Sequence, residues 1–353
     1  MVDAIGYDVG GANTKAAYIQ VRDGKYFNAR VAVEYFPVWK HPEELVDVLL
    51  KLKRQLCECK LDGIGVTTTA ELSDVYPTKR EGVNHILSCF MQAFTNVPIN
   101  VLNTEGKLEP VEVALNVPLG VAAANWAATV LLVAQKLKNC VVVDVGSTST
   151  SIIPIVEGHV VARGKTDLDK LLCGELVYTG SLRTNVAAIV QSLPIRDGVA
   201  GVSSELFALS ADVHLILGNI GVEDYTNETA DGRGKTIQEA FARLARVVCA
   251  DTEMLTQQEI INLAKFVCNR QIQQITEGLK KVYSNTKSLV SIKVPIVVTG
   301  LGKNFLAAHA AEELVVDAIV DLGTMLPKEA VLATPAFGVA QMVADKLEGE
   351  FIK

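Results

Sequence analysis

The chain contains two short stretches of the same shape, Asp8-Val-Gly-Gly-Ala-Asn-Thr-Lys15 and Asp144-Val-Gly-Ser-Thr-Ser-Thr150. Each stretch follows an apolar run, and each leads into a second apolar run that predicts a strand. We interpret each as a tight β-hairpin whose tip carries glycine and small polar residues. Because the same hairpin occurs in both halves of the chain, the sequence predicts an internal duplication of one domain topology.

Hairpins of this kind are suited to binding phosphate, because the backbone N–H groups of a sharp turn form a concave set of anion donors. Glycine permits a positive φ there and lets a phosphate approach without a Cβ clash. A third turn, Val297-Val-Thr-Gly-Leu-Gly-Lys-Asn304, follows a late apolar run and could pack against a phosphate or an adenosine. The predicted phosphate-binding residues are Gly10, Gly11, Asn13, Thr14, Lys15, Gly146, Ser147, Thr148, Ser149, Thr150, Gly300 and Gly302.

The aspartate that ends each first strand is the predicted metal ligand. Asp8 and Asp144 occupy equivalent positions, and a carboxylate there can hold Mg²⁺ directly or through water, or orient an attacking group. Lys15 adds a cation to the first hairpin. We predict Asp8, Asp144 and Lys15 as catalytic residues; the alternative is two ordinary strand-end turns and a solvated lysine.

The composition is that of a globular protein, with 49% hydrophobic and 21% charged residues, and 353 residues favour two domains. A net charge of −7 without a dense Lys/Arg run argues against a nucleic-acid-binding surface. No segment predicts a signal peptide or a membrane span, so we expect a cytoplasmic location. The seven dispersed cysteines are interpreted as thiols in a reducing compartment, and Cys57 and Cys59 lack a standard zinc spacing.

Alternating strand and helix patterns predict an α/β fold with a domain boundary near residue 120. The first domain is predicted over residues 1–120. The second is predicted over 121–353, with an insertion of loops and helices around 165–290. A helix over Leu119–Leu137 is expected to join the two, and a C-terminal helix over Pro335–Leu347 could return to the first domain.

The order of two Asp-x-Gly hairpins and a late Val-Thr-Gly-x-Gly turn resembles the actin-like ATPase and sugar kinase superfamily. That resemblance implies two ribonuclease-H-like domains with a ligand cleft between them. Within the superfamily the chain is similar to the hydantoinase/oxoprolinase branch, and there to proteins of tetrahydromethanopterin-linked one-carbon metabolism and methanofuran biosynthesis. The blocks that carry this similarity are Gly174-Glu-Leu-Val-Tyr-Thr-Gly180, Arg183-Thr-Asn185, Ser204-Glu-Leu-Phe207, Ala211-Asp-Val-His-Leu-Ile-Leu-Gly218 and Glu228-Thr-Ala-Asp-Gly232.

The resemblance implies a Mg²⁺-dependent transferase that joins an aminomethylfuran diphosphate to the phenol of γ-glutamyltyramine. An aryl ether forms and pyrophosphate leaves, so the hairpins would hold a diphosphate. Two alternatives stay open: an ATP-dependent small-molecule kinase or hydantoinase/oxoprolinase-like ATPase that binds ATP, and a non-catalytic actin-like scaffold. The expected partner is a phosphorylated small molecule, with no nucleic acid and no membrane; a homo-oligomer is an open alternative to a monomer.

The same blocks supply the predicted substrate-binding residues, which are Glu175, Tyr178, Thr179, Gly180, Arg183, Thr184, Glu205 and Asp212. Each also has a structural interpretation, because a polar loop can be an ordinary turn and acids can cap helices. His214 stands where the family is expected to carry an aromatic residue such as tyrosine, and we interpret it as a satisfied buried histidine rather than a metal ligand. The run Asp231-Gly-Arg-Gly-Lys235 resembles a phosphate loop but is interpreted as a turn before a helix.

Overall fold

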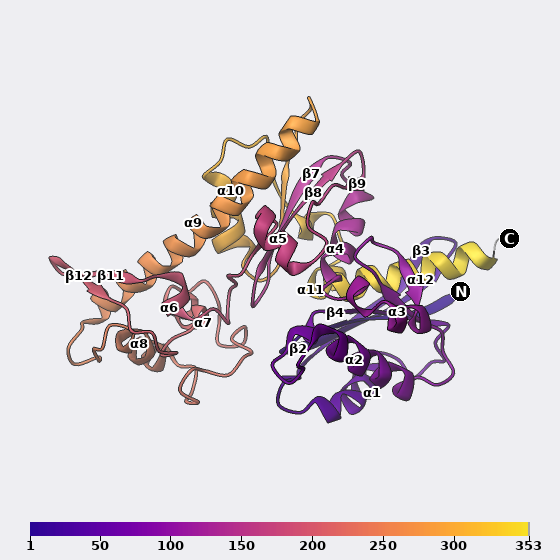
Figure 1. Ribbon diagram of the computed structural model, residues 1–353, viewed down its shortest axis with the longest axis horizontal. Coiled ribbons are helices and arrows are strands. Elements are labelled where there is room, and N and C mark those ends of the chain that lie inside the picture. The colour runs from indigo at the N-terminus through magenta and orange to yellow at the C-terminus, as the bar shows by residue number, and fades with distance from the viewer. Residues whose placement is uncertain (352–353) are drawn as a thin grey trace. The chain divides into compact units, whose positions relative to one another are not determined.

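A computed structural model describes residues 1–351, which divide into two compact units (Figure 1). Unit 1 contains Met1–Leu137, Lys165–Asp167 and the C-terminal segment from Gly323, and unit 2 contains Lys138–Gly164 and Leu168–Leu322. The boundary thus follows Leu137 rather than residue 120. The last two residues of the predicted second domain, 352–353, lie outside the described range.

Unit 1 is built on a six-stranded mixed sheet in the order β3-β2-β1-β4-β5-β6. Its strands are β1 (Val2–Val9), β2 (Asn13–Arg22), β3 (Lys25–Tyr35), β4 (Gly63–Thr68), β5 (Ile99–Leu102) and β6 (Leu108–Pro110). The first three form the predicted antiparallel meander, while β4 runs parallel to β1 and β5 parallel to β4. The carboxyl ends of β1 and β4 therefore meet at one edge, where the first hairpin lies.

Helices cover both faces of this sheet. One face packs against α1 (Leu45–Leu56) and α2 (Lys79–Ala93), which bury a shared core around Tyr7 and Phe90. The other face packs against α12 (Thr334–Phe351), and the two backbones approach so closely that a Cβ on Gly6 would lie 2.0 Å from the Ala336 carbonyl oxygen. Glycine is required at this point because of close approach rather than a special φ.

The helix predicted over Leu119–Leu137 is shorter than expected. It forms as α4 (Asn125–Ala134), after the 3₁₀ turn η3 (Pro118–Gly120) and a left-handed residue, Ala123, with φ of 52°. A positive φ at alanine interrupts helical geometry, which explains the late start. Helix α4 packs against α12, where a Cβ on Gly338 would lie 2.7 Å from the Ala128 carbonyl oxygen. That contact assigns α4 to unit 1.

Unit 2 repeats the central strand order in a second sheet, β10-β8-β7-β13-β14, with β9 paired to β8. Its strands are β7 (Cys140–Val145), β8 (Thr150–Val156), β9 (His159–Val160), β10 (Leu176–Val177), β13 (Ile296–Thr299) and β14 (Ile319–Asp321). Strand β7 is antiparallel to β8 and parallel to β13, as β1 is to β2 and β4. The predicted repeat of one topology is confirmed.

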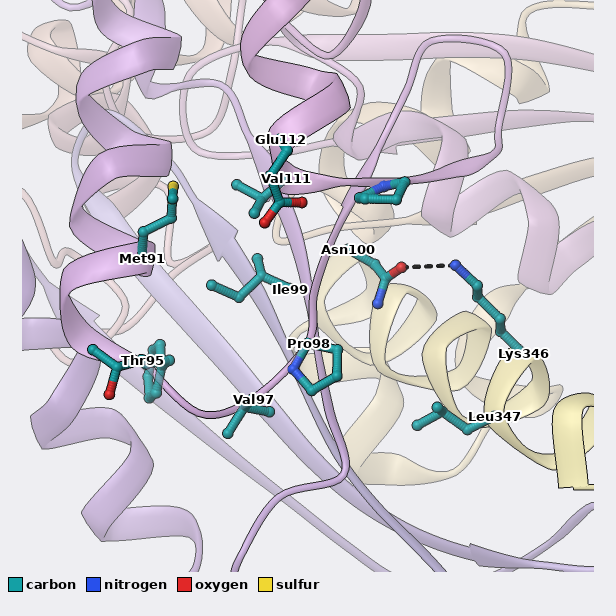
Figure 2. A pocket seen from close by; sticks show the side chains of 12 residues that line it. Met91, Thr95, Val97, Pro98, Ile99, Asn100, Val111, Glu112, Lys346 and Leu347 are labelled. Carbon is teal, nitrogen blue, oxygen red and sulfur yellow. Dashed lines mark hydrogen bonds between the residues drawn. The ribbon is translucent and has the colours of Figure 1, made fainter.

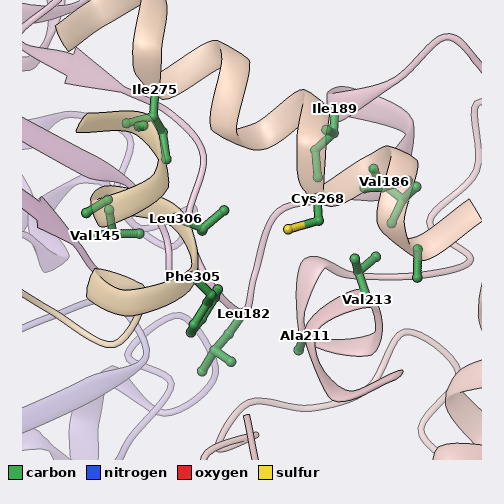
Figure 3. Packing of buried hydrophobic residues seen from close by; sticks show 14 of the residues in the cluster. Val145, Leu182, Val186, Ile189, Ala211, Val213, Cys268, Ile275, Phe305 and Leu306 are labelled. Atoms are coloured by element: carbon green, nitrogen blue, oxygen red, sulfur yellow. The ribbon is translucent and has the colours of Figure 1, made fainter. Parts of the chain in front are cut away.

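The rest of unit 2 is a largely helical extension that shares a hydrophobic core with its sheet (Figure 3). Its elements are α5 (Asp167–Cys173), whose first residue is assigned to unit 1, α6 (Val186–Ile189), β11 (Ser192–Ile195), β12 (Gly198–Gly201), α7 (Ser210–Ile216), α8 (Ile237–Arg246) and α9 (Gln257–Leu289). Helices α8 and α9 each begin with a capping box, at Thr236–Glu239 and Thr256–Glu259. None of the helices within residues 1–351 is long and apolar enough to cross a membrane.

Candidate functional site

The first predicted phosphate loop is the hairpin of unit 1 that links β1 to β2, here called hairpin 1 (residues 8–15). Strand pairing continues to Val9 and Thr14, and the Gly10 N–H donates to the Asn13 carbonyl oxygen at 2.9 Å. Gly10 and Gly11 do not adopt the predicted positive φ. Glycine serves a different purpose at Gly10, because a Cβ there would lie 2.9 Å from the Asn13 carbonyl oxygen.

Strand alternation decides which side chains of hairpin 1 can meet a ligand. Asp8 pairs with Lys15 on β2 and Thr67 on β4, so these three side chains emerge on one face of the sheet. Asn13 and Lys15 are half-buried, whereas Thr14 is fully buried behind the hairpin. The side chain of Thr14 therefore offers no donor to a ligand, which corrects that part of the predicted set.

A buried glutamate beside hairpin 1 was missed by the sequence interpretation. Glu71 follows β4 in the 3₁₀ turn η2 (Ala70–Leu72) and is 1% exposed. Burial raises the pKa of Glu71 to about 7, while Lys79, whose Nζ lies 3.8 Å from Glu71 Oε1, partly opposes the rise. An acid only three residues beyond an uncharged strand, Gly63–Thr68, was the signal that could have found it.

The second predicted phosphate loop, here called hairpin 2 (residues 144–150), links β7 to β8 in unit 2. The Gly146 N–H donates to the Ser149 carbonyl oxygen at 3.0 Å. Ser147, Thr148 and Ser149 are half-buried, but Thr150 is fully buried and its hydroxyl donates to the Thr179 carbonyl oxygen at 2.8 Å. Three of the four predicted hydroxyls thus lie at the tip.

The predicted substrate-binding loop supports hairpin 2 from within unit 2. The Ser181 N–H donates to the Gly146 carbonyl oxygen at 2.9 Å, and the Arg183 N–H donates to that of Ser147 at 3.0 Å. Gly180 packs against the same tip, where a Cβ would lie 2.5 Å from the carbonyl carbon of Thr148. The half-buried Arg183 guanidinium lies 3.4 Å from the Thr148 hydroxyl, so this loop adds a cation to hairpin 2.

The third predicted turn also packs against hairpin 2. Gly300 has φ of 85°, so the left-handed conformation predicted for the hairpins is found here instead. A Cβ on Gly300 would lie 2.5 Å from Asp144 Oδ1 and 2.3 Å from the Val145 carbonyl oxygen, while the Gly302 N–H donates to that same oxygen at 3.0 Å. The missing Cβ lets the Gly300 backbone pack against the half-buried carboxylate of Asp144, a group of the kind that binds Mg²⁺.

His214 belongs to a chain of hydrogen bonds that leads to the loop behind hairpin 2. This fully buried residue accepts from the Asn219 amide at Nδ1 (3.1 Å), and its Nε2 lies 3.0 Å from Gln271 Oε1. The Gln271 amide donates in turn to the Thr179 hydroxyl at 2.8 Å and to the Gly180 carbonyl oxygen at 3.1 Å. Burial lowers the pKa of His214 to about 4, so its ring is neutral. The predicted satisfied histidine is confirmed.

Two acids of the predicted substrate set are committed to internal contacts. Glu175 is 2% exposed, and its oxygens accept the N–H groups of Arg163 at 2.7 Å and Gly164 at 2.8 Å. Asp212 is fully buried against Arg243, with both Nε and Nη2 at 2.8 Å from its Oδ1. Burial raises the pKa of Asp212 and the Arg243 guanidinium opposes that rise. These contacts give both carboxylates a structural role.

The remaining members of that set lie in accessible loops. Tyr178 is 57% exposed and Glu205 is exposed, whereas the Thr184 hydroxyl accepts the Gly180 N–H at 2.9 Å. The run Asp231–Lys235 is a turn before α8, as interpreted, and Asp231 forms ion pairs with Arg243 and Arg246. Within unit 2, Thr179, Gly180, Arg183 and Thr184 are therefore the predicted substrate residues that gather at hairpin 2.

One cavity and one cluster of potential metal ligands were not predicted from the sequence. A cavity of about 420 Å³ in unit 1 is lined by Ile99 and Asn100, at the amino end of β5, and by Lys346, which donates to Asn100 at 2.9 Å (Figure 2). Asp8 lies near the carboxyl end of β1, so this cavity is at the opposite edge of the sheet. Among residues 1–351, three potential metal-ligand atoms come within 4.8 Å of one another only at exposed His41, Glu43 and Glu44.

Comparison with known proteins identifies relatives along nearly the whole chain. A profile of the hydantoinase/oxoprolinase family matches residues 62–346. A Methanocaldococcus jannaschii protein named (4-{4-[2-(gamma-L-glutamylamino)ethyl]phenoxymethyl}furan-2-yl)methanamine synthase is 38% identical over 345 residues, 98% of each chain. A Methanococcus vannielii protein of the same name is 37% identical over 216 residues, 60% of this chain and 94% of the relative.

Among solved structures, nucleotide-free ATP-dependent acetone carboxylase aligns with a TM-score of 0.58 at 11% sequence identity. The alignment covers 96% of this chain and 70% of that one. At this identity the likeness is informative about fold alone. Together with the repeated strand order, it shows that the chain has the predicted two-domain actin-like fold.

Proposed function

The chain belongs to the hydantoinase/oxoprolinase family, and from that membership we propose that it is a synthase of methanofuran-type cofactor biosynthesis. The observation that carries the proposal is 38% identity, over 98% of both chains, to a protein named as a phenoxymethylfuran methanamine synthase. Because the similarity extends across both units, it favours a shared reaction of the whole protein over the sharing of a single domain. We place this synthase in the cytoplasm.

The proposed reaction joins an aminomethylfuran diphosphate to the phenol of γ-glutamyltyramine. The phenol oxygen attacks the furan methylene carbon, the bond from that carbon to the diphosphate oxygen breaks, and pyrophosphate leaves. The phenol proton passes to a base, because a free phenol has a pKa near 10 and is mostly protonated at neutral pH. This makes the enzyme a transferase that releases pyrophosphate and does not consume ATP.

The hairpin of each unit is the candidate anion-binding element for this reaction. Hairpin 1 offers backbone N–H groups and Lys15, and hairpin 2 offers the hydroxyls of Ser147, Thr148 and Ser149 with the Arg183 guanidinium nearby. Donors aimed at a departing pyrophosphate stabilise the negative charge that develops on it.

Asp144, which packs against Gly300, and the equivalent Asp8 of unit 1 are the residues that would hold Mg²⁺. When bound, Mg²⁺ supplies positive charge that neutralises a diphosphate. The chain's own contribution is to hold these carboxylates at the ends of β1 and β7, next to the backbone donors of the two hairpins.

The test is incubation of the protein with both substrates and Mg²⁺, with the ether product followed by mass spectrometry and pyrophosphate by a coupled assay. Ether and pyrophosphate should appear in equal amounts without ATP. Asp144→Asn should lower kcat by roughly 100-fold, while Asp197→Asn, in the exposed turn between β11 and β12, should leave it unchanged. Hydrolysis of ATP with no ether product would overturn the proposal in favour of the kinase or ATPase alternative.

A further inference from the structure

Glu71 is a buried acid that the proposed reaction does not use. Its side chain is inaccessible to solvent, and its Oε1 has no hydrogen-bond partner among the described residues. A buried carboxylate oxygen without a donor is unfavourable in its charged form. The second oxygen, Oε2, lies 3.4 Å from the hydroxyl of Thr68, the last residue of β4.

Thr68 connects this carboxyl to the end of β1. Its hydroxyl lies 3.1 Å from the carbonyl oxygen of Val9 and accepts the Ala70 N–H at 3.0 Å. Val9 is also the acceptor for the Thr69 N–H at 2.9 Å, and it is the last residue of β1 before the glycines of hairpin 1. The same hydroxyl thus touches both the carboxyl of Glu71 and the strand end that carries hairpin 1.

The Thr68 hydroxyl has one proton and two acceptors within reach, Val9 O and Glu71 Oε2. If Glu71 is protonated, it donates to Thr68, and Thr68 donates to Val9, so each of these groups is satisfied. If Glu71 is ionised, it draws the Thr68 proton, because a charged acceptor forms the stronger hydrogen bond. The carbonyl oxygen of Val9 then loses the Thr68 donor and keeps only the Thr69 N–H of these two donors.

We propose that Glu71 is a positioning residue for hairpin 1, acting through Thr68, and that its protonated form sets hairpin 1 to bind a diphosphate. The proposal rests on the anion-binding role proposed above for hairpin 1. Glu71 itself does not touch the ligand in this scheme.

The charged groups near Glu71 affect the pKa of its carboxyl group. Lys79 of α2 lies 3.8 Å from Oε1 and favours the ionised form, but its Nζ is also 2.6 Å from Asp167, which opposes that effect. The ring of Tyr76 and the backbone of Glu71 both pack against Gly82. The Tyr76 hydroxyl lies 2.7 Å from His85 Nδ1. The Tyr76 hydroxyl and the His85 ring are thus hydrogen-bonded to each other.

The test is pyrophosphate binding by calorimetry, with Mg²⁺, at pH values from 6 to 8. Affinities are compared as the ratio of variant to wild type at each pH, because the titration of pyrophosphate itself cancels in that ratio. Glu71→Gln keeps a donor to Thr68 and carries no charge. Relative to this variant, wild-type affinity should fall about tenfold from pH 6 to 8, as Glu71 loses its proton.

Thr68→Val separates the relay from simple charge repulsion. This variant lacks the hydroxyl but keeps the Glu71 carboxyl. Its pyrophosphate affinity should therefore not fall as Glu71 loses its proton between pH 6 and 8. Thr68→Ser keeps the hydroxyl and should retain the wild-type profile. A tenfold fall that persists in Thr68→Val would show that the charge acts directly and would overturn the relay.

A readout without ligand distinguishes failure of the relay from failure of the proposed function. The backbone amide resonances of Gly10 and Thr69 should shift with the Glu71 proton in wild type and stay constant in Glu71→Gln. Constant resonances in wild type would refute the relay. Shifting resonances, with no pyrophosphate bound at any pH, would support the relay and refute the role of hairpin 1 in the proposed function.

Discussion

Replacing Glu71 by glutamine should stabilise the protein increasingly as the pH rises. Burial raises the pKa of Glu71 from 4.5 to about 7. Between these values the folded protein keeps a proton that the unfolded chain has lost, so wild-type stability falls as the pH rises through this window. From pH 5 to 8 the loss integrates to about 2.5 kcal/mol of unfolding free energy, which Glu71→Gln should not show.

Urea unfolding followed by tryptophan fluorescence measures this difference directly. Both tryptophans, Trp39 and Trp126, belong to unit 1, as Glu71 does, so their emission reports the relevant unit. Contributions from all other titrating groups cancel when the variant is subtracted from wild type at each pH. Glu58→Gln, at an exposed position of unit 1, is the matched control and should parallel wild type. Parallel pH profiles for Glu71→Gln and wild type would refute the reasoning.

Three further predictions concern the packing described above. Gly6→Ala should destabilise unit 1 by about 3 kcal/mol in urea unfolding, because its Cβ meets backbone, whereas Gly201→Ala, with open space around it, should change stability little. Arg243→Met should cost about 3–5 kcal/mol, measured by circular dichroism, because it strands the buried carboxylate of Asp212; an unchanged midpoint would contradict that pairing. His214 should titrate by NMR with a pKa of about 4, so the stability it contributes is complete above pH 6.5 and is lost as the pH falls toward 4; a pKa above 6 would show that the ring is not held neutral.

Local sequence signals were sufficient for the framework of both units. Apolar runs that end in Asp-Val-Gly located β1 and β7, and alternation after each turn located β2 and β8. The repeat of that pattern predicted the repeat of topology, because strand order follows from short connections. The two hairpins could be predicted for the same reason, since each depends on residues that are adjacent in the chain; their binding of phosphate stays a prediction.

Features that depend on contacts between residues far apart in the sequence could not be predicted from such local signals. Thr14 and Thr150 were assigned to the ligand, yet strand register turns both inward. The role of His214 depends on Gln271, which comes from another helix, α9. Glu71 has an altered pKa only because α2 and the sheet exclude water from it. Such effects arise from burial, which a one-dimensional pattern does not measure.

The packing of α12 on the first sheet has a consequence for the order of events during translation. The glycine-lined face of β1 and β4 receives its cover from residues 334–351, so a nascent chain that has completed the first 137 residues still exposes that face. Domains often fold in the order of their synthesis. Here nearly all of unit 2 leaves the ribosome before the last helix of unit 1, so the N-terminal unit should be the later one to reach its native state.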